Sequence, residues 1–180
     1  MAPMNAVLGS RQELLLRRVE SRGRTDFAIA LLATARRIDD AYNELLVGHE
    51  LSGGRFAALL AVSERPGITP ARLSDELEVK RATVTGLIDG LVKRGFVVRG
   101  SDETDRRVQT LTITSNGENR LQEVLPLVDQ WLRVLVSGLQ GLDGDTAWLL
   151  LTRIHATLGL DAQHRSLHDD RTASIHVKRF

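Results

Sequence analysis

The 180-residue chain contains no cysteine, few aromatic residues and almost no excess of charge of either sign. The missing cysteines exclude disulfides, thiolate metal ligands and regulation by cysteine oxidation. Aromatic residues make up 4% of the chain, while leucine, alanine and valine are abundant. Because this mixture favours helices packed on helices over a sandwich of strands, we expect a mainly α-helical protein.

Long apolar runs are also missing. No stretch approaches the roughly 20 apolar residues needed to span a bilayer, and the N-terminus lacks the uninterrupted apolar run of a signal peptide. We therefore expect a cytoplasmic protein without a membrane partner. Lysine and arginine total 24 against 23 acidic residues, so the net charge of +1 leaves room only for a local basic patch.

The spacing of apolar residues divides the chain into a central lobe with helical extensions. Residues 1–24 predict a flexible, arginine-bearing arm, and the polar residues 160–180 predict a tail. In residues 25–50, apolar side chains recur every three or four positions, as on one face of a helix. A similar stripe in 115–159 predicts two further helices, the second beginning at Asp143.

Residues 51–114 predict a lobe of three short helices and a β-hairpin. Ser52 and Thr69 are placed to cap the first two helices. The third helix, Lys80–Arg94, has a buried stripe with helical spacing and ends at Gly95. That stripe consists of Val84, Leu87, Ile88 and Leu91. Two β-branched runs, 96–99 and 108–113, flank a polar tip and predict the hairpin.

Two short helices followed by a hairpin form an arrangement in which the second helix can enter the major groove of DNA. Ala82, Gly86, Asp89 and Lys93 lie opposite its buried stripe. Thr83 and Thr85 lie on the flanks, and Lys80 and Arg81 at the N-terminal end. The candidate DNA contacts among them are small, hydroxylated or basic. They are Lys80, Arg81, Ala82, Thr83, Thr85 and Gly86. Small side chains permit close approach, and Arg81 has the fork that binds guanine bidentately. An ordinary solvated helix face would carry a similar pattern, so this feature alone leaves both interpretations open.

The tip of the predicted hairpin carries Asp105, Arg106 and Arg107. Arginine is attracted by the negative potential of the minor groove, and Asp105 beside it would orient a guanidinium group. Between residues 80 and 107 there are seven basic and four acidic residues. A solvated charged turn would also explain so modest an excess, so the hairpin supports DNA binding without establishing it.

Two of these motifs resemble the MarR family of regulators. The stretch Leu73–Val97 is similar to the family's helix-turn-helix. Asp105-Arg106-Arg107 followed by Leu111-Thr112-Ile113-Thr114 and Gly117 resembles its Asp-x-Arg wing tip and Leu-Thr-x-x-Gly exit. The resemblance departs at Lys80, where the family commonly has serine, and at Ile113, which replaces leucine.

The resemblance covers residues 25–159 and implies a winged helix-turn-helix with long N- and C-terminal dimerisation helices. It further implies a triangular homodimer that binds palindromic double-stranded DNA, with Arg107 in the minor groove. The amphipathic terminal helices favour dimerisation independently, although intramolecular packing is the alternative. Family members often hold small aromatic or anionic effectors between the dimerisation helices and the lobe. The positions of Tyr42 and Trp131 suit such a pocket for a phenolic compound, and a place in the core or an interface is the plainer interpretation.

Other functional classes find little support in the sequence. There is no Gly-rich phosphate loop, Gly-x-Ser-x-Gly elbow or His-Glu-x-x-His motif, so we expect no enzyme and no catalytic residue. The histidines lack paired metal-ligand spacing, and we expect neither a metal nor a cofactor. A winged module for protein contacts or chromosome architecture, without ligand control, remains the alternative to a ligand-responsive repressor.

Overall fold

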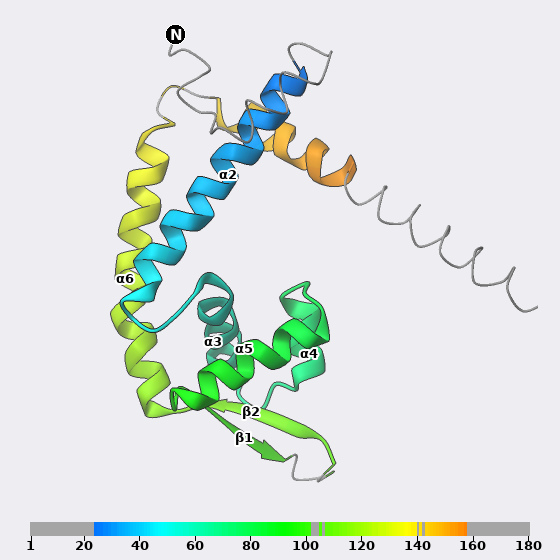
Figure 1. Cartoon of the computed structure of the whole chain (residues 1–180), viewed down its shortest axis with the longest axis vertical. Helices are drawn as coiled ribbons and strands as arrows, with labels where there is room; N and C mark the ends of the chain where they lie inside the picture. The colour runs from blue at the N-terminus through cyan, green and yellow to red at the C-terminus, as the bar shows by residue number, and fades with distance from the viewer. Residues whose placement is uncertain (1–23, 102–104, 106, 140, 142, 158–180) are drawn as a thin grey trace, which may run out of the picture. The chain divides into compact units, whose positions relative to one another are not determined.

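The computed structural model describes residues 24–101, 105, 107–139, 141 and 143–157. The predicted arm and tail lie outside these residues, apart from Arg24. The chain forms two compact units, Met1–Trp131 and Leu132–Phe180. The elements, in chain order, are α2 (Arg24–Val47), α3 (Gly53–Glu64), α4 (Pro70–Glu76), α5 (Arg81–Lys93), β1 (Val97–Ser101), β2 (Gln109–Ile113) and α6 (Ser115–Ser137). The expectation of a mainly helical winged fold is confirmed (Figure 1).

Local capping sets where the short helices begin. The Ser52 hydroxyl accepts a hydrogen bond from the Arg55 backbone N–H (3.4 Å), and the Thr69 hydroxyl accepts one from Arg72 (3.3 Å), as the sequence predicts. α4 ends at Glu76 and is followed by Glu78, whose φ of 51° lies in the left-handed region. This residue reverses the chain between α4 and α5 and so forms the turn of the helix-turn-helix.

The core of the first unit lies where α3 and α5 face each other. Three members of the predicted stripe on α5, Val84, Ile88 and Leu91, are at most 2% exposed, and they belong to one cluster with Phe56 and Leu59 of α3. Truncating side chains buried to this degree usually costs about 2–5 kcal/mol of stability. The orientation of α5 is therefore determined by packing on α3, and the opposite face of α5 is left to solvent.

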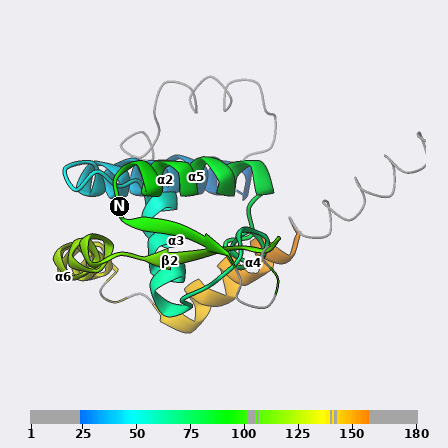
Figure 2. The same cartoon turned by 90° about the horizontal axis from the view of Figure 1, so that it is seen from below.

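β1 and β2 pair antiparallel, with Val97 opposite Ile113 and Ser101 opposite Gln109. Both strands begin one residue later than predicted, and β1 also ends two residues later. A single residue, Ile68, also bridges to Leu111, and this contact was not predicted because one residue carries no periodicity. In Figure 2 the hairpin is seen from below, with β2 extending from α6 towards α4.

The hairpin continues into α6 through a tightly packed junction. The Thr114 hydroxyl accepts a hydrogen bond from the Gly117 backbone N–H (3.1 Å) and donates to the Gly95 carbonyl (2.6 Å). A Cβ atom at Gly117 would collide with the Phe96 carbonyl oxygen and lie 2.7 Å from Ile113 Cγ1. Geometry thus requires the Thr-x-x-Gly sequence. The threonine caps α6, and the glycine lets α6 pass close to the backbone of Phe96.

α6 continues through Pro126 to Ser137, and residues 144–157 form a further helix in the second unit. Asp143 precedes that helix, as predicted; hydrogen bonds from the Thr146 hydroxyl, and then from the backbone N–H groups of Asp145 and Thr146, lower the pKa of its carboxyl. Within the described part of the chain, no helix combines the length and apolarity needed to cross a membrane.

We expect the substitution Gly117→Ala to lower the free energy of unfolding by about 3 kcal/mol, because backbone atoms cannot move away from the new methyl group. Gly86→Ala is the matched control: no described heavy atom lies within 4 Å of the place its Cβ would take. That variant should gain about 0.5–1 kcal/mol from helix propensity. Chemical denaturation at one protein concentration measures both, and equal stabilities would contradict the described junction.

Candidate nucleic-acid interface

The N-terminal half of α5 presents six sequence-predicted residues to solvent. All six are exposed, and none belongs to the hydrophobic core. They are Lys80, Arg81, Ala82, Thr83, Thr85 and Gly86. Lys80 occupies the N-cap position without a side-chain cap hydrogen bond, so the replacement of serine has removed the usual cap. The lysine ammonium group at this position is left to contact an anion as a point charge.

Four exposed residues follow one another on α5 at positions i, i+3, i+4 and i+7, and we call them the exposed strip. They are Ala82, Thr85, Gly86 and Asp89. The Thr85 hydroxyl donates a hydrogen bond to the Arg81 carbonyl (3.1 Å). Apart from the backbone of α5 itself, no described heavy atom lies within 4 Å of the place a Cβ at Gly86 would take, whereas a Cβ at Gly54 would lie 3.1 Å from Leu87 Cδ2. The four residues of the strip are thus solvent-exposed, and the side chains at positions 82, 85 and 86 are small.

Asp89 would place a negative charge on this face, but it forms an ion pair with Arg99 of β1. The two side chains are 58% and 37% exposed, so the pair contributes little to stability. Its effect is to neutralise the carboxylate and to tie the hairpin to α5. This pairing could not be predicted from the sequence, because no local pattern links positions ten apart on a helix and a strand.

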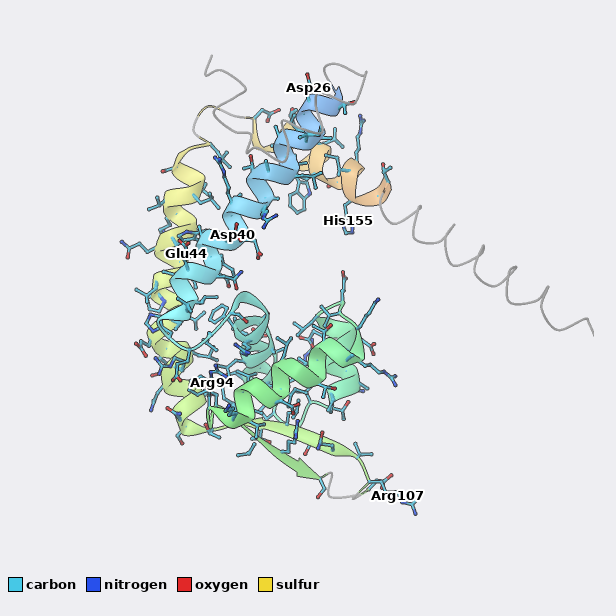
Figure 3. The ribbon with its side chains drawn as sticks, viewed as in Figure 1. Asp26, Asp40, Glu44, Arg94, Arg107 and His155 are labelled. Carbon is cyan, nitrogen blue, oxygen red and sulfur yellow. The ribbon has the colours of Figure 1, made fainter. Side chains whose placement is uncertain are left out.

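The wing tip brings Asp105 and Arg107 together through the backbone. The Arg107 backbone N–H donates to the Asp105 carboxylate (3.0 Å), and the Val108 N–H donates to the Asp105 carbonyl (2.9 Å). Asp105 thus shapes the turn on which Arg107 is mounted. Figure 3 shows Arg107 at the far end of the hairpin, whereas Arg94 lies at the C-terminal end of α5. Arg106 lies outside the described residues.

Tyr42 of α2 and Trp131 of α6 are brought together, with ring centroids 5.4 Å apart and planes tilted by 34°. Tyr42 also meets Phe56 of α3 edge-on at 6.4 Å. Both residues are half-buried. Burial raises the pKa of the Tyr42 phenol, which stays protonated near neutral pH and can donate a hydrogen bond. The two predicted effector residues therefore share one aromatic cluster at the meeting point of three helices.

Arg120 of α6 contacts the turn after α2 and the ring of Phe96, and sequence reasoning did not identify it. Its guanidinium lies 5.5 Å from the Phe96 ring centroid, 2.9 Å from Glu123 and 3.8 Å from Glu50. His49 Nδ1 is 3.0 Å from Glu123 Oε1, without hydrogen-bond geometry. These contacts connect the turn after α2, the helix α6 and Phe96, which lies between α5 and β1. Among the described residues, no three acidic or histidine side chains gather as metal ligands would.

Comparison with known proteins gives a consistent result. The model of the MarR family matches residues 49–108. The chain is 29% identical to the transcriptional repressor YetL of Bacillus subtilis over 58% of its length, and it spans 64% of YetL. It is 30% identical to the transcriptional regulator YsmB of the same organism, over 60% of this chain and 74% of YsmB. The matched region thus falls short of two thirds of YetL.

Solved structures share the fold. The repressor CouR bound to a 23-mer DNA duplex is similar with a TM-score of 0.62 and 25% identity, covering 72% of this chain and 91% of that one. PcaV of Streptomyces coelicolor, in complex with its natural ligand, has a TM-score of 0.58 and 20% identity, covering 71% and 90%. The likeness to PcaV is one of fold alone.

The ion pair on the exposed strip leads to a test of this face. Replacing Arg99 with alanine leaves the Asp89 carboxylate without its cation. Repulsion between this carboxylate and the DNA phosphates, of about 1 kcal/mol, should then weaken DNA binding about fivefold. Adding Asp89→Asn to Arg99→Ala should restore most of the affinity, as measured by fluorescence anisotropy at fixed salt. A double variant no better than Arg99→Ala would show that Arg99 acts on DNA directly rather than through Asp89.

Proposed function

The chain belongs to the MarR family of winged helix-turn-helix regulators, and we therefore propose that it is a transcription repressor that binds palindromic double-stranded DNA as a homodimer and is released by a small molecule. In this proposal α5 is the recognition helix and the β1–β2 hairpin is the wing. The protein acts on DNA in the cytoplasm, associated with the nucleoid. It uses no cofactor and catalyses no reaction.

The observation that carries the proposal is the glycine in the middle of the exposed face of α5. Glycine inside a helix costs about 1 kcal/mol relative to alanine. Close packing accounts for Gly54 and Gly117. Gly86 has no such contact among the described residues, so packing within the chain does not require glycine there. A partner that approaches the helix backbone closely would require glycine, and the floor of a major groove is such a partner.

The remaining predicted contacts fit the same geometry. Lys80 and Arg81 stand at the N-terminal end of α5, where a recognition helix meets phosphates and base edges. Arg107 enters the adjacent minor groove, with Asp105 holding the turn that presents it. Arg106, which lies outside the described residues, is proposed as a DNA contact from the sequence alone. DNA-bound CouR shares this fold and supports the placement.

Dimerisation is supported by apolar side chains that the single chain leaves in solvent. Leu125 on α6 is 42% exposed, and Leu132 and Val136 are 46% and 59% exposed. Trp148 in the last described helix is 73% exposed. Helices 25–50 and 115–159 are the proposed dimerisation elements, since a second copy would remove these surfaces from water. Two-fold symmetry then requires two half-sites about one helical turn apart.

Ligand control is proposed for the cluster of Tyr42 and Trp131. A small phenolic, or another aromatic or anionic compound, would compete with the Tyr42–Trp131 stacking or accept a hydrogen bond from the phenol. PcaV is described in complex with its natural ligand, which supports effector binding in this fold. Release follows if the ligand prefers a spacing of the two recognition helices that does not match successive grooves.

The proposal is tested by selecting bound duplexes from a random library and titrating the selected sequence against scrambled DNA. We expect a palindrome bound at least about a hundredfold more tightly than scrambled DNA, with two chains per duplex. Arg107→Ala should weaken binding strongly. Gly86→Gln should fold at least as stably as the natural chain and lose most operator affinity, because its added side chain occupies the approach surface.

Binding without sequence preference, or undiminished binding by Gly86→Gln, would contradict the operator proposal and favour an architectural module. A single subunit per duplex in sedimentation would overturn the homodimer.

For the effector, a panel of phenolic acids should contain compounds that raise the melting temperature and release operator DNA, since a ligand that binds the folded state stabilises it. Trp131→Ala should reduce this response while operator affinity without ligand persists. If every compound in the panel leaves both quantities unchanged, the proposed phenolic effector is wrong.

A further inference from the structure

The exposed strip of α5 presents few kinds of chemical group that could contact a base pair. The Thr85 hydroxyl already donates its proton to the Arg81 carbonyl, 3.1 Å away. Its remaining outward group is therefore the methyl. Ala82 adds a second methyl, and Gly86 between them adds no side chain. The carboxylate of Asp89 is paired with Arg99. Ala82, Thr85 and Gly86 thus provide apolar surface without a free hydrogen-bond donor.

Only one kind of base pair presents an apolar group in the major groove. Guanine, cytosine and adenine expose acceptors and donors there, whereas thymine adds a 5-methyl group. A base acceptor such as guanine O6 or N7, placed on the strip, would lose its water without finding a hydrogen-bond donor, which is unfavourable. A thymine methyl placed there would instead exchange water for two methyl groups and a helix backbone.

We propose that Ala82, Thr85 and Gly86 read the 5-methyl group of thymine, and that Thr85 is the residue that determines this specificity. This inference rests on the proposed entry of α5 into the major groove and names what the helix recognises there. Polar readout is left to the flanks of the strip. Arg81 is exposed at the start of α5, and the exposed Thr83 has no side-chain hydrogen bond among the described residues.

The structure also explains why Thr85 and Thr83 have different tasks although they are two residues apart. The Thr83 hydroxyl can donate a hydrogen bond to a phosphate or base, whereas the Thr85 hydroxyl already donates to the helix backbone. Replacing the Thr85 hydroxyl by a methyl should therefore be tolerated. Replacing its methyl by hydrogen should not.

The experiment uses the full chain and its selected operator, with each thymine replaced singly by deoxyuridine, which removes only the 5-methyl group. At one position in each half-site we expect affinity to fall about fourfold, the effect of one methyl group left in water. Thr85→Ser should bind the thymine duplex about fourfold more weakly and should no longer distinguish thymine from uracil at that position. Thr85→Val is the matched control and should keep the distinction.

A second experiment compares thymine with 5-methylcytosine, which carries the same methyl group. Replacing the sensed A·T pair by a pair of guanine with 5-methylcytosine keeps the methyl and changes the polar edge. We expect this duplex to bind more weakly than the thymine operator but more tightly than its unmethylated cytosine counterpart. Equal binding of the methylated and unmethylated duplexes would overturn the apolar contact.

The outcomes distinguish this inference from the function on which it rests. If no duplex is bound selectively, the proposed function fails and the inference fails with it. If the operator is bound selectively but no uracil substitution matters, or Thr85→Ser still distinguishes the two bases, methyl reading alone is overturned. Equal melting temperatures of the Ser, Val and natural proteins exclude unfolding as the cause.

Discussion

The carbonyl oxygen of Phe96 lies where the segment after α5, the β1–β2 hairpin and α6 meet. It accepts the Thr114 backbone N–H at 3.0 Å, and α6 passes so close to it that position 117 has no room for a side chain. Arg120, one turn further along α6, lies 5.5 Å from the ring of the same phenylalanine. Because two residues of α6 lie against the backbone and the ring of Phe96, we expect a movement of α6 to shift the segment between α5 and β1.

This junction relates the two proposed activities of the protein. The aromatic cluster of Tyr42 and Trp131 lies on α2 and α6, while Arg120 connects α6 to Glu50 in the turn after α2. A molecule that separates the aromatic rings would act on the same two segments that the Arg120 contacts hold. Coupling by this route needs no change inside the lobe, whose core between α3 and α5 is closely packed. We therefore expect the lobe to move as a body.

Much of this arrangement could be predicted from local sequence, and the exceptions have a common cause. The stripe of Val84, Ile88 and Leu91 and the caps at Ser52 and Thr69 depend on near neighbours, and the structure confirms them. The ion pair of Asp89 with Arg99 and the bridge of Ile68 to Leu111 join segments that only the fold brings together. Periodicity and capping rules hold no information about such pairings. The exposure of the candidate DNA-contact residues on α5 could also be predicted, because the buried stripe of a helix determines which side faces solvent.

The independence of the exposed strip from the core also bears on how such a protein can diverge. Ala82, Thr85 and Gly86 have solvent-exposed positions, and the packing that holds α5 lies on its other side. We therefore expect substitutions in the strip to carry little penalty to folding. If the strip reads DNA as proposed, intermediates between two specificities would remain folded proteins. After a duplication, one copy can acquire a new operator through a few single-residue steps while its scaffold is inherited unchanged.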